Sequence, residues 1–117
     1  MKTNKLILQK LKSSSKDEFE KAEKYYSVLS VLNNLRLTER ELQLVAFTAV
    51  RGNMSNANVR NDFCEKYKTS TYTINNIISK LKKIGVFIKD GNKVKVNPVI
   101  CLDFSNDVKL EIALDNG

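Results

Sequence analysis

Amide, hydroxyl and ammonium groups between residues 71 and 95 carry the clearest chemistry in this sequence. A helix would place four of these side chains on one face, namely those of Tyr72, Asn76, Ser79 and Lys83. The asparagine amide presents a donor and an acceptor together, which is what a side chain needs to bind adenine in the major groove of DNA. The face carries no carboxylate, so it is suited to a phosphate-rich partner.

Two sets of DNA contacts are predicted from these side chains. The residues expected to reach base edges are Tyr72, Thr73, Asn75, Asn76 and Ser79. The residues expected to contact phosphates are Thr71, Lys80, Lys82, Lys83, Lys89, Lys93 and Lys95. Each set also has an ordinary structural interpretation. The asparagines fit a solvated helix face, and exposed lysines on a strand prevent it from pairing with another chain.

A helix over residues 71–84 is expected to position the first of these groups. Its apolar side chains recur at helical spacing and are predicted to face the core, and they are Ile74, Ile77, Ile78, Leu81 and Ile84. Ser70 or Thr71 is the expected cap, and Gly85 ends the pattern. The buried arc and the polar arc therefore lie on opposite sides of one helix.

A β-hairpin is predicted over residues 86–96. The apolar spacing there changes from helical to alternating, and Asp90-Gly91-Asn92 supplies the turn, with a glycine where positive φ is needed. Pro98 prevents the second strand from continuing as a central strand. Residues 99–102 are expected either to add a further strand or to pack on the first helix.

Three further helices are expected before residue 71. The first begins near Ser15 or Lys16, and the second begins at Thr38-Glu39-Arg40-Glu41, which matches a capping box. Gly52 is expected to end the second helix in a left-handed conformation. Ser55 is the expected cap of a third helix. The predicted fold is mainly α with a small β-hairpin, an α+β class.

Charged residues are distributed unevenly along the chain. The net charge is +7, yet residues 60–98 hold nine Lys and Arg against three Asp and Glu, whereas residues 99–117 hold one lysine against four acids. We therefore expect a basic arm at 1–15, one domain at 16–102 and an acidic tail at 103–117. The tail is predicted to form a strand because apolar residues alternate along it, at Val108, Leu110, Ile112 and Leu114.

The sequence gives little support for a catalytic or metal-binding function. There is no histidine, and the two cysteines, Cys64 and Cys101, form no CxxC pair, so no zinc site, other metal site or cofactor is expected. No glycine-rich phosphate loop is present, and neither an enzyme activity nor a small-molecule substrate is predicted. No apolar run has the length of a membrane span, and none opens the chain as a signal peptide would, so a cytoplasmic protein is expected.

The order of these elements resembles the winged helix-turn-helix class of bacterial or phage DNA-binding domains. The resemblance places the two central helices at 56–66 and 71–84 and the wing at 86–96. A local likeness to the LuxR-type helix-turn-helix, which has no such wing, lies in Leu37-Thr38-Glu39-Arg40-Glu41, Gly52, Ser55-Asn56, Thr73-Ile74 and Lys80-Leu81. The winged class implies a small transcription regulator that binds double-stranded DNA, with helix 71–84 in the major groove and the wing along phosphates. Two-fold DNA sites would favour a homodimer.

A second function remains open at this stage. The apolar residues of the arm and the alternating pattern of the tail are typical of segments that pair with other proteins. The chain would then be a structural or adaptor protein of a larger assembly, such as a phage particle, and would use the same fold for protein contacts.

Overall fold

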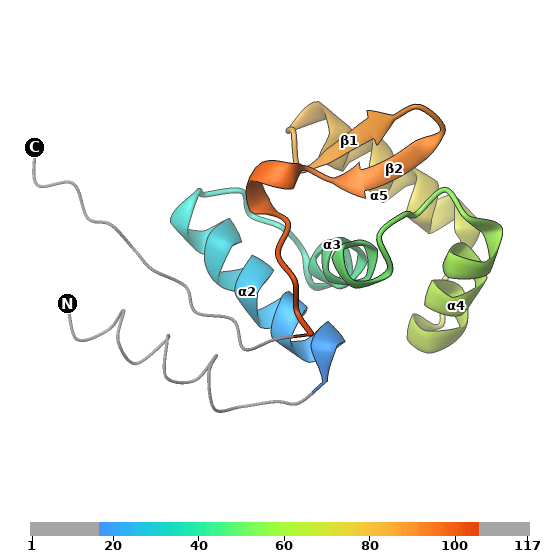
Figure 1. The fold of residues 1–117 in the computed structure, drawn as a ribbon, viewed down its shortest axis with the longest axis horizontal. Helices are drawn as coiled ribbons and strands as arrows, with labels where there is room; N and C mark the ends of the chain where they lie inside the picture. Colours follow the sequence, from blue (N-terminus) through green and yellow to red (C-terminus); the bar gives the residue numbers. More distant parts are fainter. Residues whose placement is uncertain (1–16, 106–117) are drawn as a thin grey trace, which may run out of the picture.

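The computed structural model describes residues 17–105, which form four helices and a two-stranded antiparallel hairpin (Figure 1). The elements in chain order are α2 (Glu18–Leu32), α3 (Glu39–Arg51), α4 (Ala57–Tyr67), α5 (Thr71–Lys83), β1 (Phe87–Asp90), β2 (Lys93–Val96) and the short 3-10 helix η1 (Pro98–Ile100). The predicted α+β class, mainly helical with a small hairpin, is confirmed. The arm expected at 1–15 and the strand expected at 108–114 lie outside the described residues.

Helix α3 occupies the centre of the molecule, between α2 on one side and α4 and α5 on the other (Figure 1). It supplies Leu44, Val45 and Phe47 to the core, and all three are almost completely buried. The other elements and the connections between them add fully or nearly fully buried side chains to the same core: Ala22, Tyr26, Met54, Phe63, Ile74, Leu81, Phe87 and Phe104. None of the helices within residues 17–105 combines the length and the apolarity needed to cross a bilayer.

Two of the predicted helix boundaries are confirmed, and two are corrected. Thr38 and Glu41 form both bonds of the capping box, and Gly52 ends α3 with a φ of 89°. Asp17 caps α2, one or two residues later than expected. Asn56 rather than Ser55 caps α4, because the Asn56 side chain accepts from the backbone amides that open the helix.

The apolar arc of α5 is buried as predicted, except at its last residue. Ile74, Ile77, Ile78 and Leu81 all lie in the core. Ile84 does not, since the helix ends at Lys83 and Ile84 is its C-cap, where the side chain is 44% exposed. The expectation that Ile84 belongs to the core was therefore wrong, because the chain leaves helical geometry before that position can turn inward.

The hairpin is anchored to the connection between α3 and α4. Phe87 pairs with Val96 and Asp90 with Lys93, and the Phe87, Val94 and Val96 side chains are buried. Val94 on β2 accepts a hydrogen bond from the Met54 amide at 2.9 Å. Its own amide donates to the Ser55 hydroxyl at 2.9 Å and to the Asn53 side-chain oxygen at 3.2 Å. Ser55 thus binds the hairpin instead of capping α4.

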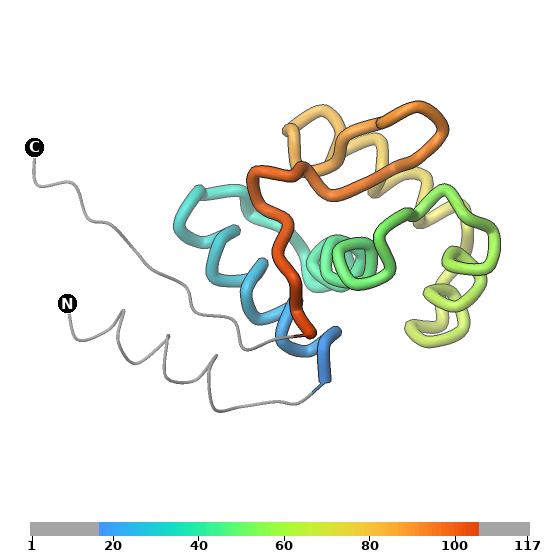
Figure 2. Tube along the Cα trace, in the orientation of Figure 1, coloured from blue at the N-terminus to red at the C-terminus, as the bar shows by residue number. Residues whose placement is uncertain are grey.

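After β2 the chain turns back and runs beside α2 (Figure 2). The Tyr26 hydroxyl donates to the Ile100 carbonyl at 2.7 Å, and the Phe104 ring lies 5.7 Å from those of both Tyr25 and Tyr26. Burial raises the pKa of the Tyr26 phenol. Of the two possibilities for residues 99–102, packing on the first helix is confirmed and the extra strand is wrong.

We expect Phe104→Ala to lower the free energy of unfolding by about 3–5 kcal/mol, because it empties a buried aromatic site against α2. Val99→Ala is the matched control, since Val99 is 88% exposed and its loss should change stability by no more than about 0.5 kcal/mol. Urea unfolding followed by circular dichroism measures both. Equal stability of the two variants would contradict the packing described here.

Candidate nucleic-acid interface

An outward stripe runs along α5, formed by Tyr72, Asn76, Ser79 and Lys83. All four side chains are exposed, Tyr72 to 76%, and they lie opposite the buried isoleucines of the same helix. Within residues 17–105 none of the four hydrogen-bonds or ion-pairs with another side chain. Their donors and acceptors are therefore available to a partner.

Two other predicted contact residues, Thr71 and Thr73, lie in the first turn of α5 and differ in exposure and in hydrogen bonding. Thr71 is exposed in the first turn. Thr73 is half-buried, and its hydroxyl lies 3.2 Å from that of Ser70, which caps the helix by accepting from the Thr73 amide. Thr71 can reach a partner directly, whereas the Thr73 hydroxyl is engaged in the cap.

The tandem asparagines differ in their partners. The Asn75 side-chain oxygen accepts from Arg60 Nη1 at 2.7 Å, while the Asn76 amide has no partner within residues 17–105. Arg60 lies on α4, and its Nε also donates to the Met54 carbonyl at 2.8 Å. Sequence reasoning missed Arg60 because its partners lie six and fifteen residues away, at spacings that follow no helical pattern.

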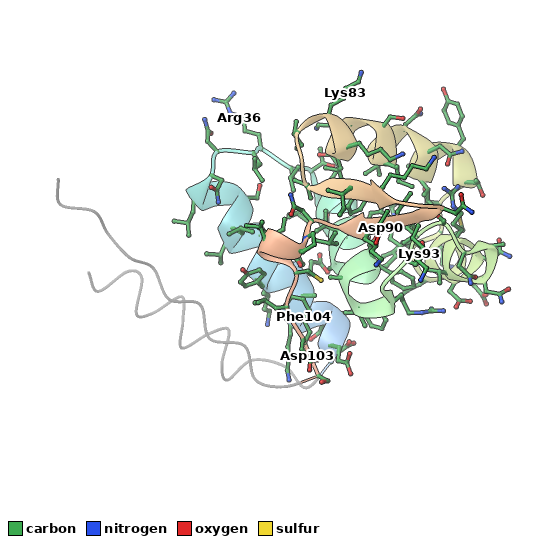
Figure 3. All side chains as sticks on the ribbon, turned by 45° about the horizontal axis from the view of Figure 1, so that its top comes forward. Arg36, Lys83, Asp90, Lys93, Asp103 and Phe104 are labelled. Atoms are coloured by element: carbon green, nitrogen blue, oxygen red, sulfur yellow. The ribbon has the colours of Figure 1, made fainter. Side chains whose placement is uncertain are left out.

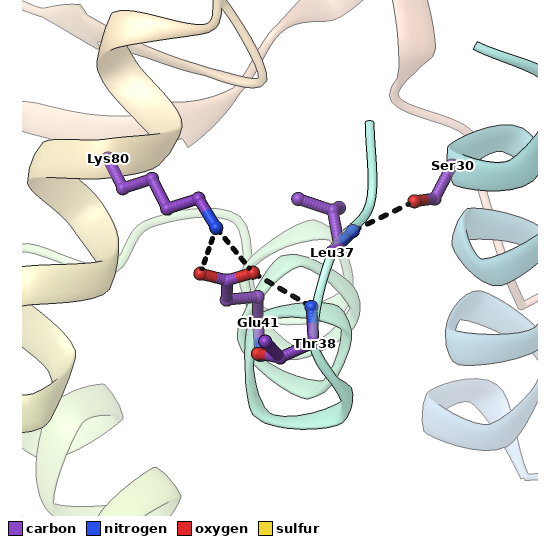
Figure 4. Close-up of polar contacts among 5 residues, drawn as sticks. All are labelled: Ser30, Leu37, Thr38, Glu41 and Lys80. Carbon is purple, nitrogen blue, oxygen red and sulfur yellow. Dashed lines mark hydrogen bonds and ion pairs between the residues drawn. The ribbon is translucent and has the colours of Figure 1, made fainter. Parts of the chain in front are cut away.

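Lys80 is bound to a carboxylate of the protein, unlike its two lysine neighbours (Figure 4). Its Nζ lies 2.8 and 3.0 Å from the two carboxylate oxygens of Glu41. The same carboxylate accepts from the Thr38 amide at 2.8 Å, which closes the capping box of α3. Lys82 and Lys83 are exposed. A phosphate contact by Lys80 stays a prediction, and the phosphate would compete with Glu41 for the ammonium.

The environment of Glu41 favours its ionised form. Burial alone would raise the pKa of this carboxyl, which is only 9% exposed. Hydrogen bonds from Lys80 and Thr38, together with the Lys80 charge, outweigh burial and hold the pKa below its ordinary value. Glu41 therefore stays negative at neutral pH and joins the start of α3 to α5.

The hairpin lysines also fall into two groups. Lys89 and Lys93 are exposed, whereas Lys95 is half-buried and lies 3.3 Å from the Asp90 carboxylate. Figure 3 shows Lys83 at the outer edge of α5 and the Asp90 and Lys93 side chains on the hairpin. Asp90 offsets part of the positive charge of the hairpin, so its cationic character comes mainly from Lys89 and Lys93.

No three His, Cys, Asp or Glu side chains gather within residues 17–105 in a way that could hold a metal ion. Cys64 is half-buried and Cys101 is exposed, and both are free thiols. In comparisons with known proteins, no family model, no curated protein and no solved structure matches this chain.

We expect Glu41→Gln to lower the free energy of unfolding at pH 7 by about 1–3 kcal/mol, because a charge-assisted bond to Lys80 is lost. A carboxyl whose pKa is lowered by folding stabilises the protein above its unfolded-state pKa. That stabilisation is lost as the pH falls through the folded-state value. The difference between variant and wild type should therefore begin to narrow as the pH falls below about 4.3, the ordinary pKa of glutamate.

Urea unfolding at pH 7, 5 and 3 measures this difference. Asp90→Asn serves as the control, since its pair with Lys95 is exposed and contributes little at any pH. A gap between Glu41→Gln and wild type that stays constant down to pH 3 would show that the carboxylate charge is not responsible.

Proposed function

We propose that this protein is a non-enzymatic DNA-binding protein, a small transcription regulator of the winged helix-turn-helix class. The observation that carries the proposal is the outward stripe of α5, which exposes Tyr72, Asn76, Ser79 and Lys83 with no acidic residue among them. A helix with this face matches the chemistry of the major groove, where base edges are flanked by phosphates.

The arrangement of elements supports the winged class. Helices α4 and α5 are joined by a short turn, the hairpin follows directly, and the segment around Met54 pairs with β2 at 2.9 Å. In this proposal α5 enters the major groove and the hairpin is the wing. The 13 residues of α5 extend over about 20 Å, which is enough to cross the groove.

The proposed contacts are assigned first to side chains that have no hydrogen-bond or ion-pair partner within residues 17–105. Asn76 would bind adenine through its amide, and Tyr72 and Ser79 would reach neighbouring base edges or phosphates. Four exposed lysines would neutralise phosphates without breaking an ion pair, and they are Lys82, Lys83, Lys89 and Lys93. Lys80 and Lys95 would have to share their ammonium groups with Glu41 and Asp90.

A second candidate function, that of an adaptor in a larger assembly, has its own support away from α5. A groove of ≈ 270 Å³ between α2 and α3 is lined in part by Val31, Leu37 and Leu42, and Arg36 also lines it. Val31 is 77% exposed and Leu32 is 50% exposed. Exposed apolar side chains beside a groove suit a protein contact, whether with a second copy or with another chain.

A mobility-shift titration over a salt series tests the proposed function, first with a random duplex pool and then with duplexes selected from it. We expect the logarithm of the binding constant to fall with the logarithm of salt concentration at a slope of about −4, since four lysines displace counterions. Asn76→Ala should reduce the preference for the selected duplex about tenfold. Lys83→Ala should weaken binding to all duplexes and reduce the slope by about one.

Lys24→Ala on α2 is the control and should leave both quantities unchanged. Absence of binding to any duplex at low salt would refute the DNA-binding proposal. The adaptor function would then be tested by deleting residues 106–117, which leaves the buried Phe104 in place, and by measuring assembly. Val31→Asp, which places a charge at the groove, should weaken assembly if the adaptor interpretation holds.

A further inference from the structure

Arg60 joins three parts of the molecule through one planar group. It lies on α4 and is only partly exposed, and its Nε donates to the Met54 carbonyl at 2.8 Å. Its Nη1 donates to the side-chain oxygen of Asn75 on α5 at 2.7 Å. The guanidinium fork fixes the angle between these two bonds, which a flexible ammonium cannot do.

The bond from Arg60 bears on which of the two adjacent asparagines, Asn75 or Asn76, can bind a base. An asparagine that binds adenine uses its oxygen and its nitrogen at the same time. The Asn75 oxygen already receives a charge-assisted bond from Arg60, which takes up one of its two acceptor positions and ties the amide to α4. Asn76 keeps both groups unengaged within residues 17–105.

The bonds of Arg60 also bear on the hairpin. Met54, whose carbonyl Arg60 holds, donates its own amide to the Val94 carbonyl at 2.9 Å. The Val94 amide donates to the Ser55 hydroxyl, also at 2.9 Å. Arg60 therefore lies at the centre of a chain of bonds that begins on α5 and ends on β2.

We propose that Arg60 is a positioning residue that assigns base recognition to Asn76 rather than Asn75 and holds α5 in register with the hairpin. This inference rests on the proposed function, because it describes how the same surface selects a DNA sequence. Arg60 acts through Asn75 and Met54 and need not touch the DNA itself.

Arg60→Lys tests the inference, because it keeps the positive charge and removes the fork. We expect binding to random duplex and the salt slope to stay as in wild type, while the preference for the selected duplex falls about tenfold. Arg51→Lys is the matched control, since Arg51 forms a surface pair with Asp62 at 2.7 Å and should show no change. In the Arg60→Lys background, Asn75→Ala should alter the selected sequence more than it does in wild type.

Amide hydrogen exchange of the unbound protein provides a readout that does not depend on DNA. The Met54 and Val94 amides should exchange faster in Arg60→Lys, while the core amide of Leu81 keeps its wild-type rate. Equal acceleration at Leu81 would indicate general destabilisation and would overturn the positioning role, as would unchanged rates at Met54 and Val94.

The DNA measurements separate the remaining outcomes. A lower salt slope with the preference intact, seen in Arg60→Met but not in Arg60→Lys, would make Arg60 a simple phosphate contact and overturn the inference. Failure of the wild type to prefer any duplex would refute the proposed function and, with it, the assignment of base recognition to Asn76. Hydrogen exchange would then decide alone whether Arg60 couples α5 to the hairpin.

Discussion

The Glu41 carboxylate is the point on which the arrangement of the helices depends. It closes the N-terminus of α3 through the Thr38 amide, and it holds Lys80 of α5 at 2.8 Å. A carboxylate that is 9% exposed would be costly without such partners, because burial removes most of its hydration. The partners also restrict where α5 can lie, since the ammonium must reach the first turn of α3. The ion pair between Glu41 and Lys80 and the buried isoleucines together determine which way the outward stripe of α5 faces.

Local patterns predicted much of this fold. The capping box at Thr38 and Glu41, the glycine that ends α3 and the hairpin turn at Gly91 are each encoded within a few residues. Periodicity alone placed four apolar side chains of α5 in the core. Such signals can be read from the sequence because the interactions that satisfy them lie within one or two turns of the chain.

The remaining features depend on partners far away in the chain, which the sequence could not reveal. Lys80, Lys82 and Lys83 look alike in the sequence, yet only Lys80 meets a carboxylate 39 residues before it. Asn75 and Asn76 are chemically identical, and only the approach of Arg60 distinguishes them. The sequence predicts Ser55 as a helix cap, because no local pattern reveals that its hydroxyl accepts from the Val94 amide 39 residues away. The candidate interface is thus predictable as a face, whereas the roles of its members depend on tertiary contacts.

The return of the chain along α2 also bears on the order in which the protein can fold. Tyr26 hydrogen-bonds a carbonyl 74 residues later, and the rings of Tyr25 and Tyr26 are covered by Phe104. During synthesis, α2 leaves the ribosome first among the described helices but lacks this cover until residue 104 has followed it. Contacts of such high sequence separation form late and slow folding, because a long loop must be closed before they stabilise anything. Helices α2 to α5 and the hairpin can pack earlier, because α2 packs mainly on the neighbouring α3, and Phe104 covers Tyr25 and Tyr26 last.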